Sequence, residues 1–125
     1  MHVSRLYTGA DNQSHFEDLE VPLIPTRYGA LSDTVPSDGV IFRETPVGGS
    51  LGFHVAPRRQ FVVNLFGVVE IECGDSTKRR LGAGDIMLAD DTTGQGHITR
   101  DIEGPRRSLF IPIPDDYDVT GWRVG

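Results

Sequence analysis

The feature that most constrains this chain is a succession of short strand-like segments that begins near residue 39 and leaves no room for helices between them. Each segment combines apolar alternation with residues that favour strands. The segments are 40–45, 51–55, 60–66, 68–73, 77–81, 86–89, 97–102 and 106–112. Turn-forming residues separate them, and the chain contains 15 Gly and 8 Pro. Because parallel strands need long crossover connections, this pattern predicts an antiparallel β sandwich or barrel.

The first part of the chain has a different pattern. Residues 1–38 show weak periodicity and several Gly and Pro breakers, which predicts an extended arm with one or two short strands, such as 20–24. The arm holds too many apolar side chains to be left in water, so we expect it to pack on the barrel or on a partner subunit. A chain of 125 residues fits one domain, in which residues 39–125 form the barrel.

Composition argues against two classes of partner. Eighteen acidic residues against 12 Lys and Arg give a net charge of −6, which disfavours binding to nucleic acid or to anionic membranes. The basic pairs Arg58–Arg59 and Arg106–Arg107 are too short to follow a phosphate backbone. Residues 1–20 lack the apolar stretch of a signal peptide, and no apolar run approaches the length of a membrane span. We therefore expect a cytoplasmic protein with neither nucleic acid nor membrane as its partner.

The chain has a single cysteine, Cys73, so no disulfide can form within it. This residue lies in an apolar alternation. The pattern favours a buried structural thiol over a nucleophile.

Three polar residues each interrupt or open an apolar strand: His54, Gln60 and His97. Side chains alternate faces along a strand, so Asn64 shares the face of Gln60, and Thr99 shares the face of His97. If those faces look inward, His54, Gln60 and His97 form a site. Asn64 and Thr99 are then candidates for the wall of a ligand pocket.

Other charged residues lie near these positions. Arg59 can reach into the mouth of the barrel and hold a carboxylate by a bidentate contact, or it is a solvated arginine at a strand start. One of Asp90, Asp91 and Asp101 can orient the imidazole of His97. Turn formation explains Asp90 and Asp91 equally well.

The order and spacing of these residues resemble the two sequence motifs of the cupin superfamily. The first motif runs Gly, five residues, His-x-His, three or four residues, Glu, six residues, Gly. The matching positions in this chain are Gly48, His54, Ala56, Gln60 and Gly67. Every spacing agrees, whereas Ala56 replaces the second His and Gln60 replaces the Glu.

The second motif runs Gly, five residues, Pro-x-Gly, two residues, His, three residues, Asn. Here it begins at Gly84, His97 arrives two positions later than in the pattern, and Asp101 replaces the Asn. The chain also resembles a group of small bacterial cupins that share the segments Pro-Arg-Arg-Gln (57–60) and Asp-Thr-Thr-Gly-x-Gly-His (91–97). That resemblance assigns no reaction.

The resemblance implies a double-stranded β-helix, the jelly-roll barrel of cupins, assembled as a homodimer. It also implies a divalent metal (Mn, Fe, Ni or Zn) held by His54, Gln60 and His97. On this basis we expect a metal-dependent enzyme that acts on a small organic molecule by lyase, isomerase or dioxygenase chemistry. The alternatives are a metal-free module that binds a small ligand through the same residues, and a purely structural role. The two histidines favour the metal, whereas Gln60 and Ala56 favour the metal-free module.

Overall fold

The computed structural model describes residues 1–124, and the all-β class predicted from the sequence is confirmed. The strands are β1 (His2–Thr8), β2 (Ser14–Glu20), β3 (Ile24–Thr26), β4 (Gly29–Leu31), β5 (Ile41–Thr45), β6 (Ser50–His54), β7 (Gln60–Glu72), β8 (Lys78–Leu81), β9 (Ile86–Asp90) and β10 (His97–Pro112). A 3₁₀ turn, η1, follows at Thr120–Trp122. Within residues 1–124, no helix has the length and apolar character that crossing a bilayer requires.

Eight of the strands form one mixed sheet. Its order is β2-β1-β9-β7-β10-β5, with β6 also paired to β10 and β8 to β7. The β1–β9 pair is parallel and the other pairs are antiparallel. Each of β2, β5, β6 and β8 pairs with one strand only, so the pairing among residues 1–124 does not close the sheet into the barrel expected from the sequence.

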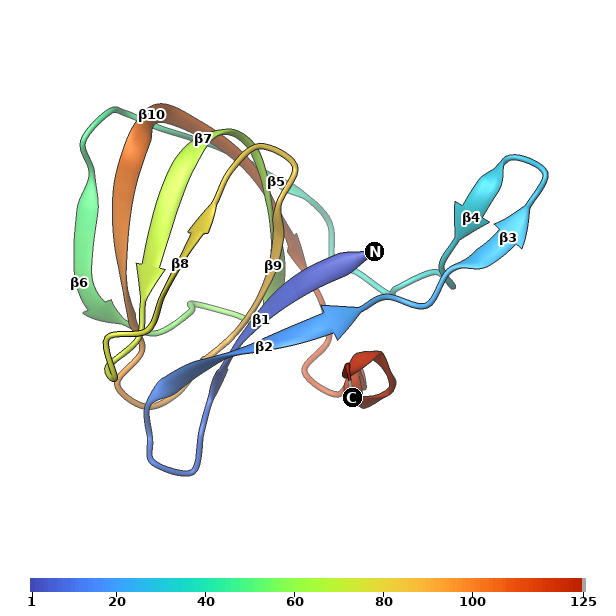
Figure 1. Cartoon of the computed structure of the whole chain (residues 1–125), viewed down its shortest axis with the longest axis horizontal. Coiled ribbons are helices and arrows are strands. Elements are labelled where there is room, and N and C mark those ends of the chain that lie inside the picture. Colours follow the sequence, from blue (N-terminus) through green and yellow to red (C-terminus); the bar gives the residue numbers. More distant parts are fainter. Residues whose placement is uncertain (125) are drawn as a thin grey trace.

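The long strands β7 and β10 bend and contribute to two layers that face each other (Figure 1). The first half of β7 pairs with β9 and the second half with β8. The bend lies at Gly67, whose φ is +83° and where a Cβ would lie 2.7 Å from the carbonyl oxygen of Glu103. Because the register of β10 against β7 also shifts between Glu103 and Arg107, the two strands change direction without losing their pairing. The four segments predicted separately at 60–66, 68–73, 97–102 and 106–112 are therefore two continuous strands.

Apolar side chains fill two separate regions. The cluster between the layers consists of Leu6, Ala56, Val69, Ile71, Cys73, Leu81, Met87 and Ala89. A second cluster, which the C-terminal segment joins, consists of Val3, Leu19, Leu88, Ile113, Val119 and Trp122. The neighbours Met87 and Leu88 belong to different clusters, as the alternation of side chains along a strand requires. Cys73 is buried, as predicted, and is a free thiol.

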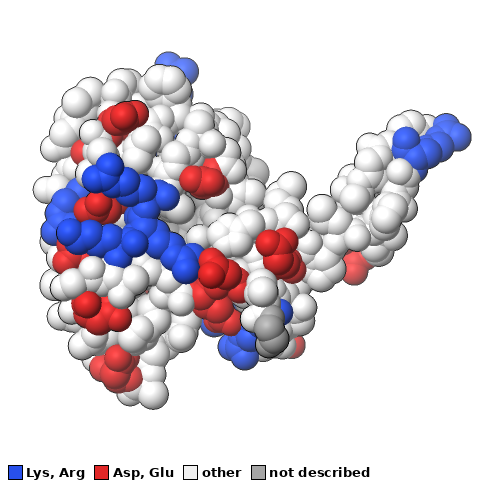
Figure 2. Space-filling model, in the orientation of Figure 1, with Lys and Arg blue, Asp and Glu red and all other residues white. Residues whose placement is uncertain are grey.

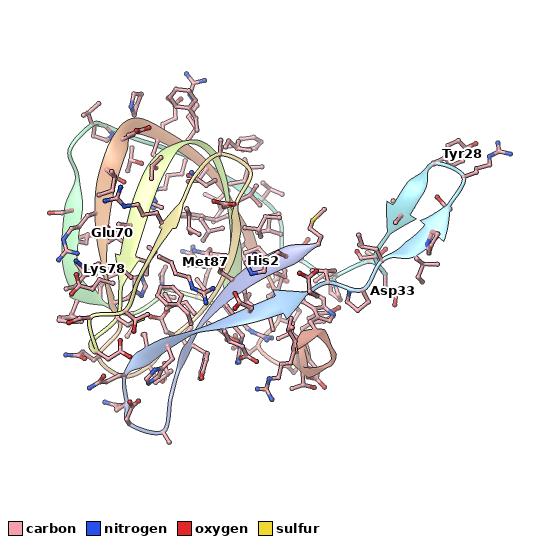
Figure 3. The ribbon with its side chains drawn as sticks, viewed as in Figure 1. His2, Tyr28, Asp33, Glu70, Lys78 and Met87 are labelled. Atoms are coloured by element: carbon pink, nitrogen blue, oxygen red, sulfur yellow. The ribbon has the colours of Figure 1, made fainter. Side chains whose placement is uncertain are left out.

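The expected N-terminal arm divides into two parts. The β1–β2 hairpin belongs to the main sheet, with β1 beside β9. Beyond residue 21 the chain leaves the sheet, and the β3–β4 hairpin projects away from the rest of the molecule (Figure 1). Tyr28, at the tip of this hairpin in Figure 3, is 79% exposed, and Leu31 is 57% exposed. The strand expected at 20–24 falls on the junction between β2 and β3.

Candidate functional site

A cavity of about 330 Å³ lies between the two layers. Most of its wall is apolar and includes Val62, Phe110 and Met87, which lies near the centre of the molecule in Figure 3. The polar side chains that line it are Arg43, His54, Gln60, Asn64, His97, Thr99 and Arg106. The structure thus brings together the three residues expected to hold a metal and two of the three expected to form a ligand pocket.

The pairing of β6 with β10 places His54 next to His97. The two residues are register partners, and their imidazole rings have centroids 4.5 Å apart. This approach depends on Gly96, because a Cβ at that position would overlap the carbonyl group of His54. Gly96 also has a φ of +78°, a conformation that favours glycine. The absence of a side chain at Gly96 therefore allows the two imidazoles to lie close together.

Both imidazoles have one nitrogen occupied by the protein. The Nδ1 of His54 lies 2.8 Å from the carbonyl oxygen of Gly52, and the Nδ1 of His97 lies 2.5 Å from Oδ2 of Asp91. A carbonyl and an ionised carboxylate only accept hydrogen bonds, so we assign the proton of each neutral ring to Nδ1. Neither Nε2 forms a hydrogen bond with any of residues 1–124. Two nitrogen lone pairs are therefore available at neighbouring positions.

Asp91 is the acid that contacts His97. Its side chain is fully buried, and its Oδ2 also accepts a hydrogen bond from Ser14 Oγ at 2.6 Å. The sequence pointed equally to Asp90, but the Asp90 carboxylate instead forms ion pairs with Arg5 and Arg59. The sequence could not distinguish Asp91 from Asp90, because the position of the Asp91 side chain depends on contacts with distant segments, such as Ser14 on β2.

Gln60 and Asn64 share the cavity face of β7, as the alternation predicted. Gln60 is 3% exposed, and its Oε1 accepts a hydrogen bond from Nη1 of Arg58 at 3.0 Å. An amide oxygen has two lone pairs, so this contact leaves one available. The amide nitrogen of Asn64 donates to the carbonyl of Gly67 at 2.8 Å, while its buried Oδ1 has no hydrogen-bond partner within residues 1–124.

The structure does not bring Arg59 to this cavity. Its guanidinium is buried elsewhere, with Nε 3.0 Å from Oδ1 of Asp90. Its Nη1 donates to the backbone carbonyls of Pro114 and Tyr117. Arg59 therefore fastens the C-terminal segment to the body of the protein. A local sequence pattern cannot anticipate carbonyl acceptors more than fifty residues away.

The donor atoms around the two histidines fit a first-row divalent metal. Imidazole nitrogens suit Zn, Fe and Ni, and an amide oxygen is an acceptable third ligand. Among residues 1–124 no group of three or more His, Cys, Asp or Glu side chains is arranged to hold a metal. A metal held by the two histidines would therefore take its third protein ligand from the neutral Gln60, because Ala56 provides none. Such a set compensates the charge of a dication less than one that includes a carboxylate.

Two residues that the sequence interpretation missed also line the cavity: Arg43 from β5 and Arg106 from β10. Arg106 is 7% exposed, with Nε 3.4 Å from Oδ1 of Asp101. Burial lowers the pKa of Arg106, the nearby carboxylate of Asp101 partly offsets that effect, and the like charge of Arg43 lowers it further. The guanidinium remains protonated at neutral pH. Alternation places Arg106 on the same face as Phe110, but the sequence does not show which face is internal.

The outer surface carries a different arrangement of charge. Basic and acidic side chains are interleaved over part of the molecule in Figure 2. On the layer formed by β7, β8 and β10, they form ion pairs between Lys78, Arg80 and Arg100 and the acids Glu70 and Glu72. The cavity, in contrast, has two arginines and no acidic side chain among its described lining residues.

Comparison with known proteins leaves the family open. No protein-family model matches the chain, and no curated protein matches it. The resemblance to cupins therefore rests on the motif spacing over residues 48–101.

Proposed function

We propose that this protein is a small cytoplasmic enzyme of the cupin type. In this proposal its cavity binds a divalent first-row metal, one of Mn, Fe, Ni or Zn, through His54, Gln60 and His97 and acts on a small organic molecule. The observation that carries the proposal is the pair of adjacent imidazoles whose Nε2 atoms have no partner among residues 1–124. Both imidazoles line a largely apolar cavity, and an imidazole Nε2 without a protein partner is free to coordinate a metal or to accept a hydrogen bond from a ligand.

Each residue of the proposed site has a distinct task. The carbonyl of Gly52 and the carboxylate of Asp91 fix the orientation and tautomer of the two imidazoles. Gln60 offers an amide oxygen, and the apolar walls limit access of water. A bound metal would supply a Lewis-acid or oxygen-activating centre, which is the kind of centre that metal-dependent lyases, isomerases and dioxygenases use.

A metal-free module that binds a small ligand is the second candidate. It is favoured by the neutral amide of Gln60 and the methyl group of Ala56 at positions where the cupin motif has metal ligands. In that case the Nε2 atoms of His54 and His97 accept hydrogen bonds from the ligand itself.

Elemental analysis of protein purified without a chelating tag distinguishes the metal-dependent enzyme from the metal-free module. The metal proposal predicts nearly one equivalent of first-row metal per chain, lost in His97→Ala. His15→Ala is the matched control, because His15 lies on β2, bonds to Asp11 and does not line the cavity. Folded protein that contains no metal and takes up none of Mn, Fe, Ni or Zn would refute the metal proposal and leave the metal-free module.

We further propose that the protein acts as a homodimer in which residues 22–38 pack against the partner. Ile24, Tyr28 and Leu31 support this proposal, since all three are exposed apolar residues on a hairpin that stands apart from its own chain. Apolar side chains gathered on a projecting element are typical of contact surfaces.

A further inference from the structure

Two arginines converge on one part of the cavity because of the pairing between β5 and β10. Arg43 is the register partner of Ser108, and Arg106 is the register partner of Thr45. Arg43 and Arg106 therefore occupy diagonal positions on the same face of neighbouring strands, within reach of long side chains. Two like charges are thus brought together on an internal surface.

The guanidinium of Arg106 is incompletely satisfied by the protein. Its side chain is 9% exposed, and its Nε is 3.4 Å from both Asp101 Oδ1 and Thr45 Oγ1. Neither Nη atom forms a hydrogen bond with any of residues 1–124. Hydrogen bonds from a guanidinium to an anionic oxygen are among the stronger ones, so a ligand that supplies acceptor oxygens to these Nη atoms would be favoured here.

The charge balance at this position favours a single negative charge on the ligand. Arg43 forms no ion pair with any of residues 1–124 and lies with its Cζ 5.3 Å from the ring centroid of Phe110. Asp101 offsets one of the two guanidinium charges, so about one positive charge remains for a ligand. A ligand with a single negative charge would neutralise this remaining positive charge.

The arginines are also accessible from outside. Arg43, Arg106 and Thr99 line both the cavity and a smaller surface recess of about 150 Å³. They therefore lie between the cavity and solvent, where an entering anion would meet them first. The cavity itself, at about 330 Å³, is at the small end of the range for ligand sites.

We infer that the cavity binds a small monocarboxylate with an apolar body, whose carboxylate is held by Arg43 and Arg106 and whose body packs against the apolar wall. This inference deepens the proposed function by naming its substrate class, and it rests on that proposal in taking the cavity to be the functional site. It requires no metal.

Calorimetric titration of the metal-free protein, prepared with a chelator, tests the inference. The probes are benzoate and hexanoate, with benzamide and hexanamide as neutral matches of the same shape. We expect the carboxylates to bind at least tenfold more tightly than the amides. Phenyl phosphate is the third probe, and we expect it to bind more weakly than benzoate because it carries more charge. Amides that bind as tightly as the acids, or a phosphate that binds more tightly than benzoate, would overturn the inference.

Substitution of each arginine tests whether the preference for carboxylates over amides comes from Arg43 and Arg106. Arg43→Gln and Arg106→Gln should each weaken benzoate binding at least tenfold and leave benzamide binding unchanged. Arg107→Gln is the matched control, since Arg107 is the exposed neighbour of Arg106 on the opposite face of β10. Circular dichroism checks folding, and if the buried Arg106 variant fails to fold, the half-buried Arg43 decides the question. Unchanged benzoate affinity in Arg43→Gln would refute the assignment.

Elemental analysis of the same protein, before and after addition of Zn²⁺, separates this inference from the metal proposal. The benzoate titrations of metal-free wild type and Arg43→Gln report on the arginines and do not depend on the outcome of the metal analysis. Arginine-dependent binding of benzoate by a protein that takes up no metal would refute only the metal proposal. Stoichiometric metal binding without any affinity for carboxylates would refute only the inference about the substrate class.

Discussion

At His97 the position of the proton depends on a residue six positions earlier in the chain. The carboxylate of Asp91 lies against Nδ1 and also accepts a hydrogen bond from Ser14. As long as that carboxylate is ionised, it only accepts, so Nδ1 keeps its proton and Nε2 keeps its lone pair. In the proposed metal site, the ligand atom of His97 therefore depends on Asp91, which is not itself a ligand.

The substitution Asp91→Asn tests this dependence. An amide has the same shape but can turn its NH₂ group towards Nδ1, which would move the imidazole proton to Nε2 and block the ligand position. We expect the affinity for Zn²⁺ to fall by about 10- to 100-fold, as measured by competition with a chromogenic chelator. Asp90→Asn is the control, because it breaks ion pairs with Arg5 and Arg59 and should lower stability without changing metal affinity. Equal affinity in the two variants would contradict this role of Asp91.

Cys73 gives a prediction about pH. Burial, together with repulsion from Asp75 and Asp91, raises the pKa of the Cys73 thiol to about 11, compared with an ordinary value of 9.0. The thiol therefore ionises more readily in the unfolded chain than in the folded protein. Its contribution to stability is fully present below pH 9 and is lost as the pH rises towards about 11.

Urea unfolding between pH 8 and pH 11 measures this effect. The free energy of unfolding of the wild type should decrease more steeply above pH 9 than that of Cys73→Ala, which lacks the titrating group. Folded protein at pH 8 should also fail to react with a thiol reagent that labels the unfolded chain. Parallel pH profiles for the two proteins would contradict the prediction.

At the scale of strands, the sequence located the segments well from residue 40 onward, but it did not identify β1 and β2 as strands of the main sheet. It also did not reveal which segments are continuous. Gly67 has the appearance of a turn between two strands, because glycine commonly marks turns. Whether the chain reverses or only bends at such a point depends on partners far away in sequence, here the carbonyl oxygen of Glu103. Such contacts are invisible to local periodicity.

The candidate site could likewise be predicted where it depends on local side-chain direction, but not where it depends on long-range packing. Period-two alternation correctly grouped Gln60 with Asn64, and His97 with Thr99, because side-chain direction along a strand is a local property. Which face turns inward is decided by packing of the two layers. That is why the sequence offered Arg59 as a candidate for the cavity, with a solvated arginine as the alternative, and did not offer Arg106.

Gly96→Ala tests how β6 and β10 are held together. The added Cβ would overlap the carbonyl of His54 and would also strain a residue with a φ of +78°. We expect a loss of about 3 kcal/mol or more in the free energy of unfolding, together with weakened metal binding. Gly84→Ala is the matched control, since Gly84 has a φ of +88° but nothing within 4 Å of the added atom. It should cost only about 1–2 kcal/mol. Equal denaturation midpoints for the two variants would contradict the steric argument.

At the scale of the whole molecule, the β3–β4 hairpin projects away from the rest of its own chain and carries exposed apolar side chains. We propose above that these side chains contact a partner subunit. Light scattering coupled to gel filtration should give the mass of a dimer for the wild type. A Tyr28→Asp, Leu31→Asp double variant should give the mass of a monomer, because charged residues would replace apolar contacts in the interface. Val47→Asp, a change of an exposed apolar residue outside the hairpin, should remain dimeric. A wild-type monomer at high concentration would contradict the proposed assembly.

The two facing layers enclose one cavity that contains both the paired imidazoles and the paired arginines. We propose above that the two imidazoles bind a metal. Anomalous X-ray diffraction at the absorption edge of the metal, from crystals of protein loaded with Zn²⁺ or Mn²⁺, tests that claim most directly. The proposal predicts a single strong peak in contact with Nε2 of His54, Nε2 of His97 and Oε1 of Gln60. Peaks confined to surface residues such as His2 or His15, with none in the cavity, would contradict it.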